Sequence, residues 1–280
     1  MSSSTPPPKD PYSRVDYRRL IRWRKRIARE EPFLRSLLDR APEGSVLDVG
    51  CGTGEHVAFF ADAGARAIGL DVSENMIEAA REHEAAGRGR FVAGEAADAP
   101  ALLSNDLPFG LAICLGNMLP HILEDEDLER WIHSMHAILE PGGLLLVQLL
   151  NYTRILEREE RNLPLNLRPA PLAGSDGADQ DPDAQDPRRE IVFMRLMRSE
   201  GDGRVLFFPT TLELDPDAEV PVRVVSSRRV PLRAWSAEEL GQRLTRAGFG
   251  VELHGDMTQG AYVPSDSRDL VIVAQRGPRA

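Results

Sequence analysis

The residues best suited to chemistry are three glycines at alternate positions and an aspartate that follows them. Gly50, Gly52 and Gly54 come directly after an apolar run, and Asp71 ends a second apolar run. Glycine lets a ligand approach the main chain, because no side chain intervenes. A carboxylate at a strand tip can accept hydrogen bonds from both hydroxyls of a ribose. This pattern indicates a nucleoside site.

The spacing of the glycines favours a ligand without phosphate. A dinucleotide-binding turn has its third glycine one place later, where pyrophosphate lies against the N-terminus of the next helix. Here that place is Glu55, whose carboxylate would repel phosphate. Each feature alone has an ordinary alternative, a turn after a strand or a cap for the next helix. Their order along the chain favours the nucleoside site.

The elements that would position these residues alternate between strands and helices, which predicts a parallel sheet covered on both faces. Buried strands are expected at residues 45–49, 67–70, 90–93, 111–115 and 143–150. The intervening helices are expected up to residue 63, after a Ser73 cap, and over residues 127–139. A helix over residues 236–247, opened by the capping pair Ser236 and Glu239, and strands at 250–253 and 269–275 would complete the sheet.

Composition divides the chain further. We expect a disordered tail at residues 1–14, a helical lid at 15–40 in which Pro32 separates two helices, and core segments at 41–150 and 232–280. Residues 151–231 are expected to insert a small antiparallel cap, with strands at 191–196, 205–214 and 220–230. Within it, residues 170–189 are rich in Pro, Gly, Asp and Ala and are expected to be mobile.

Charge and cysteine content exclude several classes of protein. The 280 residues include 34 Lys and Arg against 44 Asp and Glu, a net charge of -10, with no dense basic stripe, so nucleic acid is not an expected partner. No segment approaches the roughly eighteen uncharged residues of a membrane helix, which predicts a cytoplasmic protein without a membrane partner. Cys51 and Cys114 are too few for a disulfide framework or a zinc site and are expected to be buried.

The run Val46-Leu47-Asp48-Val49-Gly50-Cys51-Gly52-Thr53-Gly54, followed by Asp71, resembles the class I S-adenosylmethionine-dependent methyltransferases. This resemblance implies an α/β, Rossmann-like seven-stranded, mostly parallel sheet with helices on both faces, and S-adenosyl-L-methionine as cofactor. Pro141-Gly142-Gly143 matches that family's turn before the fifth strand, whereas Gly110 stands where an Asp often precedes the fourth. The cofactor-binding residues that it implies are Arg26, Asp48, Gly50, Cys51, Gly52, Gly54, Asp71, Val72, Met76, Glu95, Ala96, Asp98 and Leu115.

Two further segments, residues 114–121 and 151–156, are similar to the glycine and glycine/sarcosine N-methyltransferases. Those relatives carry a histidine and an arginine where this chain has Leu149 and Leu150, and their arginine grips the substrate carboxylate. Losing that charge-assisted bond costs roughly 1.5 to 3 kcal/mol. A small-molecule acceptor other than free glycine is therefore expected, with an amine nitrogen as the favoured methylated atom.

The resemblance also implies roles for individual side chains, each with an ordinary alternative. Arg26 would pair with the methionine carboxylate or be a solvated helix charge, and Asn117 would orient the acceptor or serve a turn. Tyr152 and Tyr17 would line the pocket or simply pack. For His121 a structural hydrogen bond is favoured over a role as general base. Three aromatic residues are assigned to packing: His56, Trp131 and Trp235.

Two other functions stay open at this stage. One is a nicotinamide-dependent oxidoreductase on a similar sheet, which Glu55 and the glycine spacing disfavour. The other is a non-catalytic module that keeps the fold and binds the cofactor without turnover. The sequence does not identify the acceptor, decide between nitrogen, oxygen and carbon as its reacting atom, or fix the oligomeric state.

Overall fold

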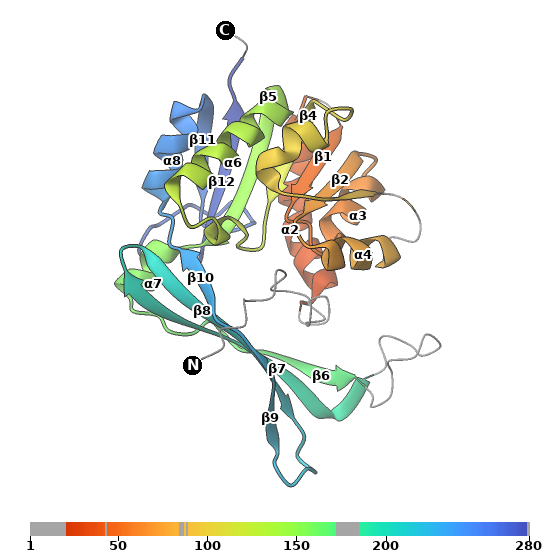
Figure 1. Cartoon of the computed structure of the whole chain (residues 1–280), viewed down its shortest axis with the longest axis vertical. Helices are drawn as coiled ribbons and strands as arrows, with labels where there is room; N and C mark the ends of the chain where they lie inside the picture. The colour runs from red at the N-terminus through yellow and green to blue at the C-terminus, as the bar shows by residue number, and fades with distance from the viewer. Residues whose placement is uncertain (1–20, 43, 84–86, 88, 172–184, 279–280) are drawn as a thin grey trace, which may run out of the picture. The chain divides into compact units, whose positions relative to one another are not determined.

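The computed structural model in Figure 1 describes residues 21–278 except 43, 84–86, 88 and 172–184. The expected tail at residues 1–14 and Tyr17 lie outside the described residues. The chain divides into two compact units, the first formed by Met1–Asn151 with Trp235–Ala280 and the second by Tyr152–Ala234. Each unit has a sheet of its own.

The sheet of the first unit has seven strands in the order β3-β2-β1-β4-β5-β12-β11. All neighbours pair in parallel except β12, which runs antiparallel to both β5 and β11. Every residue of β1 and β4 is buried, as expected of apolar strands covered on both faces. The strands are β1 (Ser45–Val49), β2 (Arg66–Asp71), β3 (Arg90–Ala93), β4 (Phe109–Cys114), β5 (Leu139–Leu150), β11 (Phe249–His254) and β12 (Asp269–Arg276).

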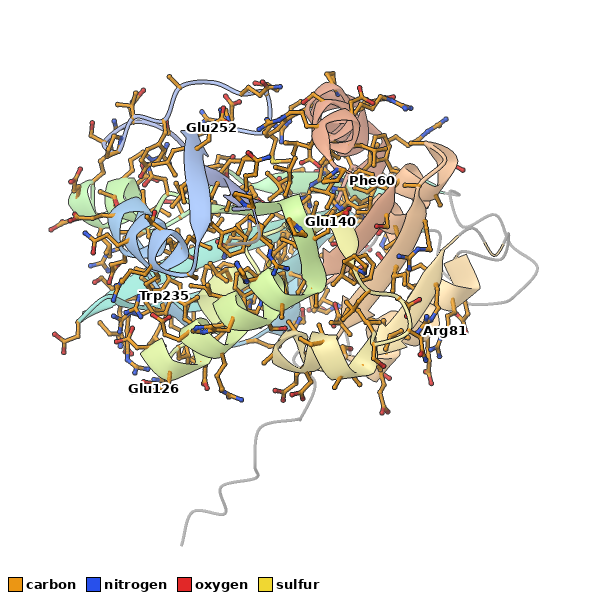
Figure 2. The ribbon with its side chains drawn as sticks, turned by 90° about the horizontal axis from the view of Figure 1, so that it is seen from above. Phe60, Arg81, Glu126, Glu140, Trp235 and Glu252 are labelled. Atoms are coloured by element: carbon orange, nitrogen blue, oxygen red, sulfur yellow. The ribbon has the colours of Figure 1, made fainter. Side chains whose placement is uncertain are left out.

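Helices cover both faces of this sheet, as predicted. Figure 2 shows Phe60 of α3 and Glu126 of α6 on opposite sides of the strands. Ser73 caps α4 by accepting a hydrogen bond from Met76 N, and Ser236 and Glu239 form the predicted capping box of α8. The helices are α2 (Trp23–Arg40), α3 (Glu55–Asp62), α4 (Glu74–His83), α5 (Ala99–Leu102), α6 (Asp125–Ile138) and α8 (Ala237–Arg246), with short 3-10 turns at η1 (Ala96–Asp98) and η2 (Leu119–His121).

Two sites where the sequence predicts an interruption lie inside a helix and a strand of the structure. The prediction that Pro32 separates two helices is wrong, because α2 continues through it. Proline removes one main-chain hydrogen bond, but the burial of Phe33, Leu34 and Leu37 on the core side outweighs that loss. The expected turn at Pro141-Gly142-Gly143 lies inside β5, where the pairing jumps from Phe109 opposite Leu139 to Leu111 opposite Leu144. The extra residues are accommodated as a bulge.

The second unit is an antiparallel sheet preceded by a short helix. Its strands follow the order β10-β8-β7-β6, and β9 also pairs with β8. The sequence predicted three of these strands, merged β9 with β10 and missed β6. Its elements are α7 (Tyr152–Glu157), β6 (Asn166–Pro171), β7 (Gln185–Gly201), β8 (Arg204–Leu214), β9 (Val222–Ser227) and β10 (Val230–Arg233).

Both ends of the range 170–189, which the sequence predicts to be mobile, belong to strands, and the predicted mobility itself stays a prediction. Ala170 pairs with Asp186 and Pro171 with Gln185, and these bonds extend the β6 and β7 ladder. Main-chain pairing does not require apolar side chains, so composition alone missed it. Residues 172–184 lie outside the described part of the chain.

Cys51 and Cys114 are free and buried, as predicted. No helix in the described part of the chain is long and apolar enough to cross a membrane. The same residues contain no group of His, Cys, Asp or Glu side chains that could hold a metal ion.

Candidate functional site

The glycine turn after β1 forms the floor of a pocket. Gly50, Gly52 and Gly54 all have positive φ, at 75°, 54° and 85°, which side chains rarely adopt. A Cβ on Gly50 would lie 2.9 Å from the Met118 side chain, and one on Gly54 would lie 2.7 Å from the Phe91 ring. At Gly52 no described atom beyond its chain neighbours lies within 4 Å of that position. Gly52 is thus the glycine whose missing side chain leaves open space.

Asp71, at the end of β2, is fastened to this turn. Its Oδ2 accepts a hydrogen bond from Gly52 N at 2.9 Å, and its Oδ1 accepts one from Ser73 N at 2.9 Å. The side chain is buried, so these bonds replace hydration that folding removes. The carboxylate therefore fixes the turns after two neighbouring strands and has a structural task as well as the predicted binding role.

Asp48 on β1 is the second buried acid of the floor. Its Oδ2 has no hydrogen-bond partner among the described residues, although it is fully enclosed. Burial raises the pKa of Asp48 to about 6, and the negative charges of Asp71 and Glu55 act in the same direction. An enclosed acceptor without a partner, at the edge of a pocket, fits a ligand that carries a cation or a donor.

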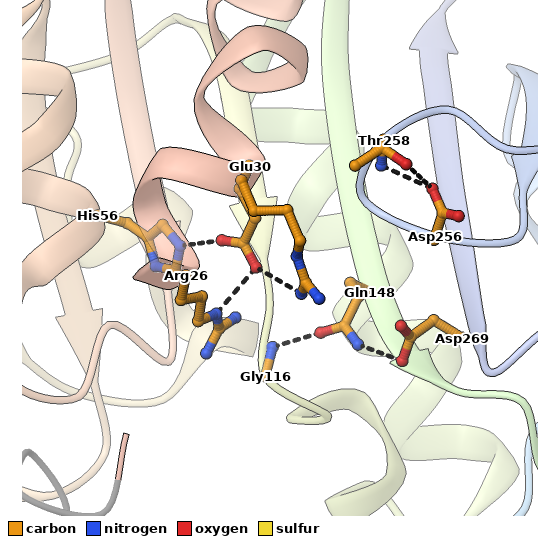
Figure 3. A network of polar contacts seen from close by, with 9 residues as sticks. Arg26, Glu30, His56, Gly116, Gln148, Asp256, Thr258 and Asp269 are labelled. Atoms are coloured by element: carbon orange, nitrogen blue, oxygen red, sulfur yellow. Dashed lines mark hydrogen bonds and ion pairs between the residues drawn. The ribbon is translucent and has the colours of Figure 1, made fainter. Parts of the chain in front are cut away.

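The wall of the pocket comes from α2. Arg26 Nε donates to Glu30 Oε1 at 2.9 Å, and His56 Nε2 lies 2.9 Å from Glu30 Oε2, as Figure 3 shows. Burial raises the pKa of Glu30, but the hydrogen bond with His56 and the charge of Arg26 outweigh it and hold the pKa below its usual value. Trp23 stacks against the Arg26 guanidinium, 5.0 Å from its ring centroid. Glu30 thus joins the helix α2 to α3 and orients Arg26.

Floor and wall line one pocket, whose empty volume of about 580 Å3 includes space open to solvent. Eight of the predicted cofactor residues line it: Arg26, Asp48, Gly50, Cys51, Gly52, Asp71, Met76 and Leu115. The other lining residues are Trp23, Thr53, His56, Gly116 and Met118.

The remaining predicted residues are not among those lining the pocket, and their roles stay predictions. Val72 follows Asp71 and is 64% exposed. Glu95, Ala96 and Asp98 lie at the turn after β3, and Tyr152 is a buried residue of the second unit. Gly54 packs against Phe91 below the turn.

The assignment of His56 to packing alone is wrong, because this buried residue lines the pocket and contacts Glu30. A single sequence contains no signal for this pair, since its two members are 26 residues apart. Packing holds for Trp131 and Trp235, which are both buried, and the Trp235 indole donates to Ile122 O at 3.0 Å.

The turn after β4 is fixed to β5 by its own bonds. Gly116 N donates to Gln148 Oε1 at 2.8 Å, and Gln148 Nε2 donates to Asp269 Oδ1 at 3.0 Å. Asn117 has a positive φ of 66°, and its Oδ1 accepts a hydrogen bond from Leu150 N at 3.0 Å. The Asn117 side chain thus serves this turn, and its role toward an acceptor stays a prediction.

His121 at the end of η2 and Asp269 at the start of β12 have shifted pKa values. Burial lowers the pKa of His121, which favours the neutral imidazole, and burial raises the pKa of Asp269. The structural hydrogen bond expected of His121 stays a prediction.

Residues 46–143 match the family model described as "Methyltransferase domain". This chain carries a class I S-adenosylmethionine-dependent methyltransferase domain. Over 141 residues it is 33% identical to a glycine/sarcosine N-methyltransferase from Parasynechococcus marenigrum, covering 50% of this chain and 49% of that protein. Over 111 residues it is 37% identical to a malonyl-[acyl-carrier protein] O-methyltransferase from Pseudescherichia vulneris, covering 40% of each.

The chain spans about half the length of the glycine/sarcosine relatives that it matches. A solved sugar N-methyltransferase from Streptoalloteichus sp has a TM-score of 0.69 at 22% identity and covers 99% of this chain and 98% of that chain. This likeness shows that the fold extends beyond the matched domain.

Proposed function

We propose that this chain transfers a methyl group from S-adenosylmethionine to a small-molecule acceptor, with an amine nitrogen as the methylated atom. The observation that carries the proposal is the open, left-handed Gly52 beside the fixed carboxylate of Asp71. A nucleoside can lie on bare main chain there, and a carboxylate has acceptor positions for backbone N–H groups and sugar hydroxyls together.

The donors and acceptors of the pocket fit the whole cofactor. Beyond the ribose, the unpartnered Oδ2 of Asp48 suits the ammonium of the methionine portion. The Arg26 guanidinium on the pocket wall suits its carboxylate. An elongated ligand with a diol at one end and an amino acid at the other thus meets complementary groups along the pocket.

When bound, the cofactor supplies a methyl carbon already activated by a positive sulfur, so the protein's task is positioning. In this mechanism Asp71 and Gly52 hold the nucleoside, and Arg26, oriented by Glu30, holds the opposite end. An amine acceptor that arrives deprotonated needs no side chain as base. The bonded turn at Gly116 would then keep the acceptor side of the pocket rigid.

Binding of a nicotinamide dinucleotide is disfavoured by Glu55. This buried carboxylate is the first residue of α3, and its Oε2 accepts a hydrogen bond from Thr53 Oγ1 at 2.7 Å. Pyrophosphate would have to lie at the same helix N-terminus. A fixed negative charge at that place opposes it.

An amine is proposed as the acceptor because relatives described as glycine/sarcosine N-methyltransferases match about half of the chain. Free glycine is not proposed, since Leu150 stands where the resemblance expects an arginine. O-methylation is the second candidate, supported by the match to a malonyl-[acyl-carrier protein] O-methyltransferase.

Calorimetry and a product assay test the proposal together. The chain should bind S-adenosylhomocysteine and not NAD, and methyl-labelled cofactor should transfer its label to an amine in a metabolite extract. Binding of NAD alone would contradict the proposal. Cofactor binding without any labelled product over a broad acceptor panel would favour the non-catalytic module.

A further inference from the structure

Two enclosed polar atoms of opposite character in this pocket have no hydrogen-bond partner among the described residues. One is the acceptor Asp48 Oδ2, and the other is the donor Nε1 of Trp23. Buried donors and acceptors in native proteins are almost always paired, so an exception requires an explanation. Both residues line the same pocket, which makes a ligand the natural partner for both atoms.

The Trp23 donor lies beside a fixed cation. Trp23 and Arg26 are three positions apart on α2 and therefore neighbours on one helix face. Glu30 engages Arg26 through Nε, so the outer edge of the guanidinium, with Nη1 and Nη2, is the part left to meet a ligand. A Cβ on Gly116, another lining residue, would lie 3.9 Å from Arg26 Nη1.

We propose that Trp23 is a ligand-binding residue whose indole N–H, together with the outer edge of Arg26, holds the carboxylate of the bound cofactor. A neutral donor and a cation side by side suit a carboxylate, which has two oxygens to satisfy. The Asp48 acceptor would hold the ammonium of the same amino acid group. This inference rests on the proposed function, because it assumes that the amino acid end of the cofactor reaches α2.

Replacement by phenylalanine separates this role from packing. The Trp23 ring lies 5.0 Å from the Arg26 guanidinium and meets the His56 ring edge-on at 5.6 Å. Phenylalanine keeps an aromatic face for both contacts but has no N–H. If Trp23 only packs, Trp23→Phe should leave the affinity for every ligand of the pocket nearly unchanged.

The test compares two ligands that differ in the amino acid group. S-adenosylhomocysteine carries it, whereas 5′-methylthioadenosine keeps the adenosine and sulfur but lacks the carboxylate and ammonium. Calorimetry should show that Trp23→Phe lowers the affinity for S-adenosylhomocysteine about tenfold or more, the usual effect of losing a hydrogen bond to a charged group. The affinity for 5′-methylthioadenosine should change by less than about twofold on the same reasoning.

Trp235→Phe is the matched control, because the Trp235 indole already donates to Ile122 O inside the protein. This variant should lower the melting temperature and leave the ratio of the two affinities unchanged. Equal weakening of both ligands by Trp23→Phe, or no weakening of either, would overturn the role of Trp23 alone. Failure of the unaltered chain to bind S-adenosylhomocysteine would overturn the proposed function and this inference with it.

Discussion

The floor and the wall of the pocket are built on different principles. On the floor, the turn after β1 offers main chain at Gly52, and Asp71 fixes that turn from the end of β2. On the wall, α2 offers charged and aromatic side chains that Glu30 and His56 hold in place. The family match at residues 46–143 includes the floor and excludes α2. Local pattern within the matched segment therefore builds the floor, whereas the wall depends on contacts between residues far apart in the sequence.

The largest expected effect is on the floor, at Asp71. Asp71→Ala should weaken S-adenosylhomocysteine binding by about 100-fold, because two hydrogen bonds from ribose to a charged group are lost. It should also destabilise the protein by about 1–3 kcal/mol, since it leaves the buried N–H groups of Gly52 and Ser73 unpaired. Calorimetry and thermal unfolding measure the two effects, with the exposed Asp39→Ala as control. Unchanged affinity would remove Asp71 from the site.

The glycines sharpen the comparison within the floor. Gly54→Ala should destabilise the protein by about 2–5 kcal/mol, because its Cβ would overlap the Phe91 ring in a left-handed conformation. Gly52→Ala meets open space and should cost only about 1–2 kcal/mol of stability. Its Cβ would enter the space proposed for the nucleoside, so ligand affinity should fall. Denaturant unfolding measures the stability of both variants, and calorimetry measures their affinity. A smaller loss of stability in Gly54→Ala than in Gly52→Ala would contradict this contrast.

Ionisation of the buried Asp48 should lower the stability of the protein and raise its affinity for the cofactor, so both should depend on pH. Burial raises the folded pKa of Asp48 from the ordinary value of 3.8 to about 6, so folding favours the protonated form. Protonated Asp48 therefore stabilises the folded state by up to about 3 kcal/mol relative to the ionised form. This stabilisation is complete below about pH 4 and is lost as pH rises through about 6. Asp48→Asn avoids the loss, so the gap in melting temperature between variant and parent should widen from pH 4 to pH 7.5.

Asp48→Asn should also lower the affinity for S-adenosylhomocysteine, because the ligand's ammonium loses its charged partner. Affinity of the parent should fall below pH 6, where Asp48 becomes protonated, and affinity of Asp48→Asn should not follow that step. A melting-temperature gap that does not change with pH would contradict the assignment of an ionised, enclosed Asp48.

The smallest expected effect concerns the acceptor. Leu150→Arg restores a cation at the end of β5 and should raise kcat/KM for amino acids that carry a carboxylate by about tenfold. The neutral Leu150→Gln serves as control for length and polarity. Steady-state assays with glycine and a carboxyl-free amine measure the change in preference. An unchanged kcat/KM for glycine would contradict the position inferred for Leu150, but not the proposed cofactor binding on the floor.

Sequence reasoning predicted the floor because local pattern determines it. Apolar runs fix the strands, glycines at positive φ fix the turn, and the ends of parallel strands meet at one edge of a sheet. On the wall, the resemblance supplied Arg26, but the contacts that hold α2 and the turn after β4 in place were missed. The contact between Glu30 and His56 joins residues 26 positions apart, and that between Gln148 and Asp269 joins residues 121 apart.

The remaining differences have similar physical origins. Pro32 predicted a helix break, but tertiary packing of α2 outweighs the one hydrogen bond that proline removes. The strand β6 was missed because Asn166–Pro171 has no alternating apolar pattern, and its pairing with β7 is made by main chain. Side-chain patterns do not report such pairing.

A crystal structure of the chain with bound S-adenosylhomocysteine would show where the nucleoside lies. Both ribose hydroxyls should lie within hydrogen-bond distance of the Asp71 carboxylate, with the nucleoside over Gly52. A ligand bound elsewhere, with the space above Gly52 filled by protein or left without density, would contradict it.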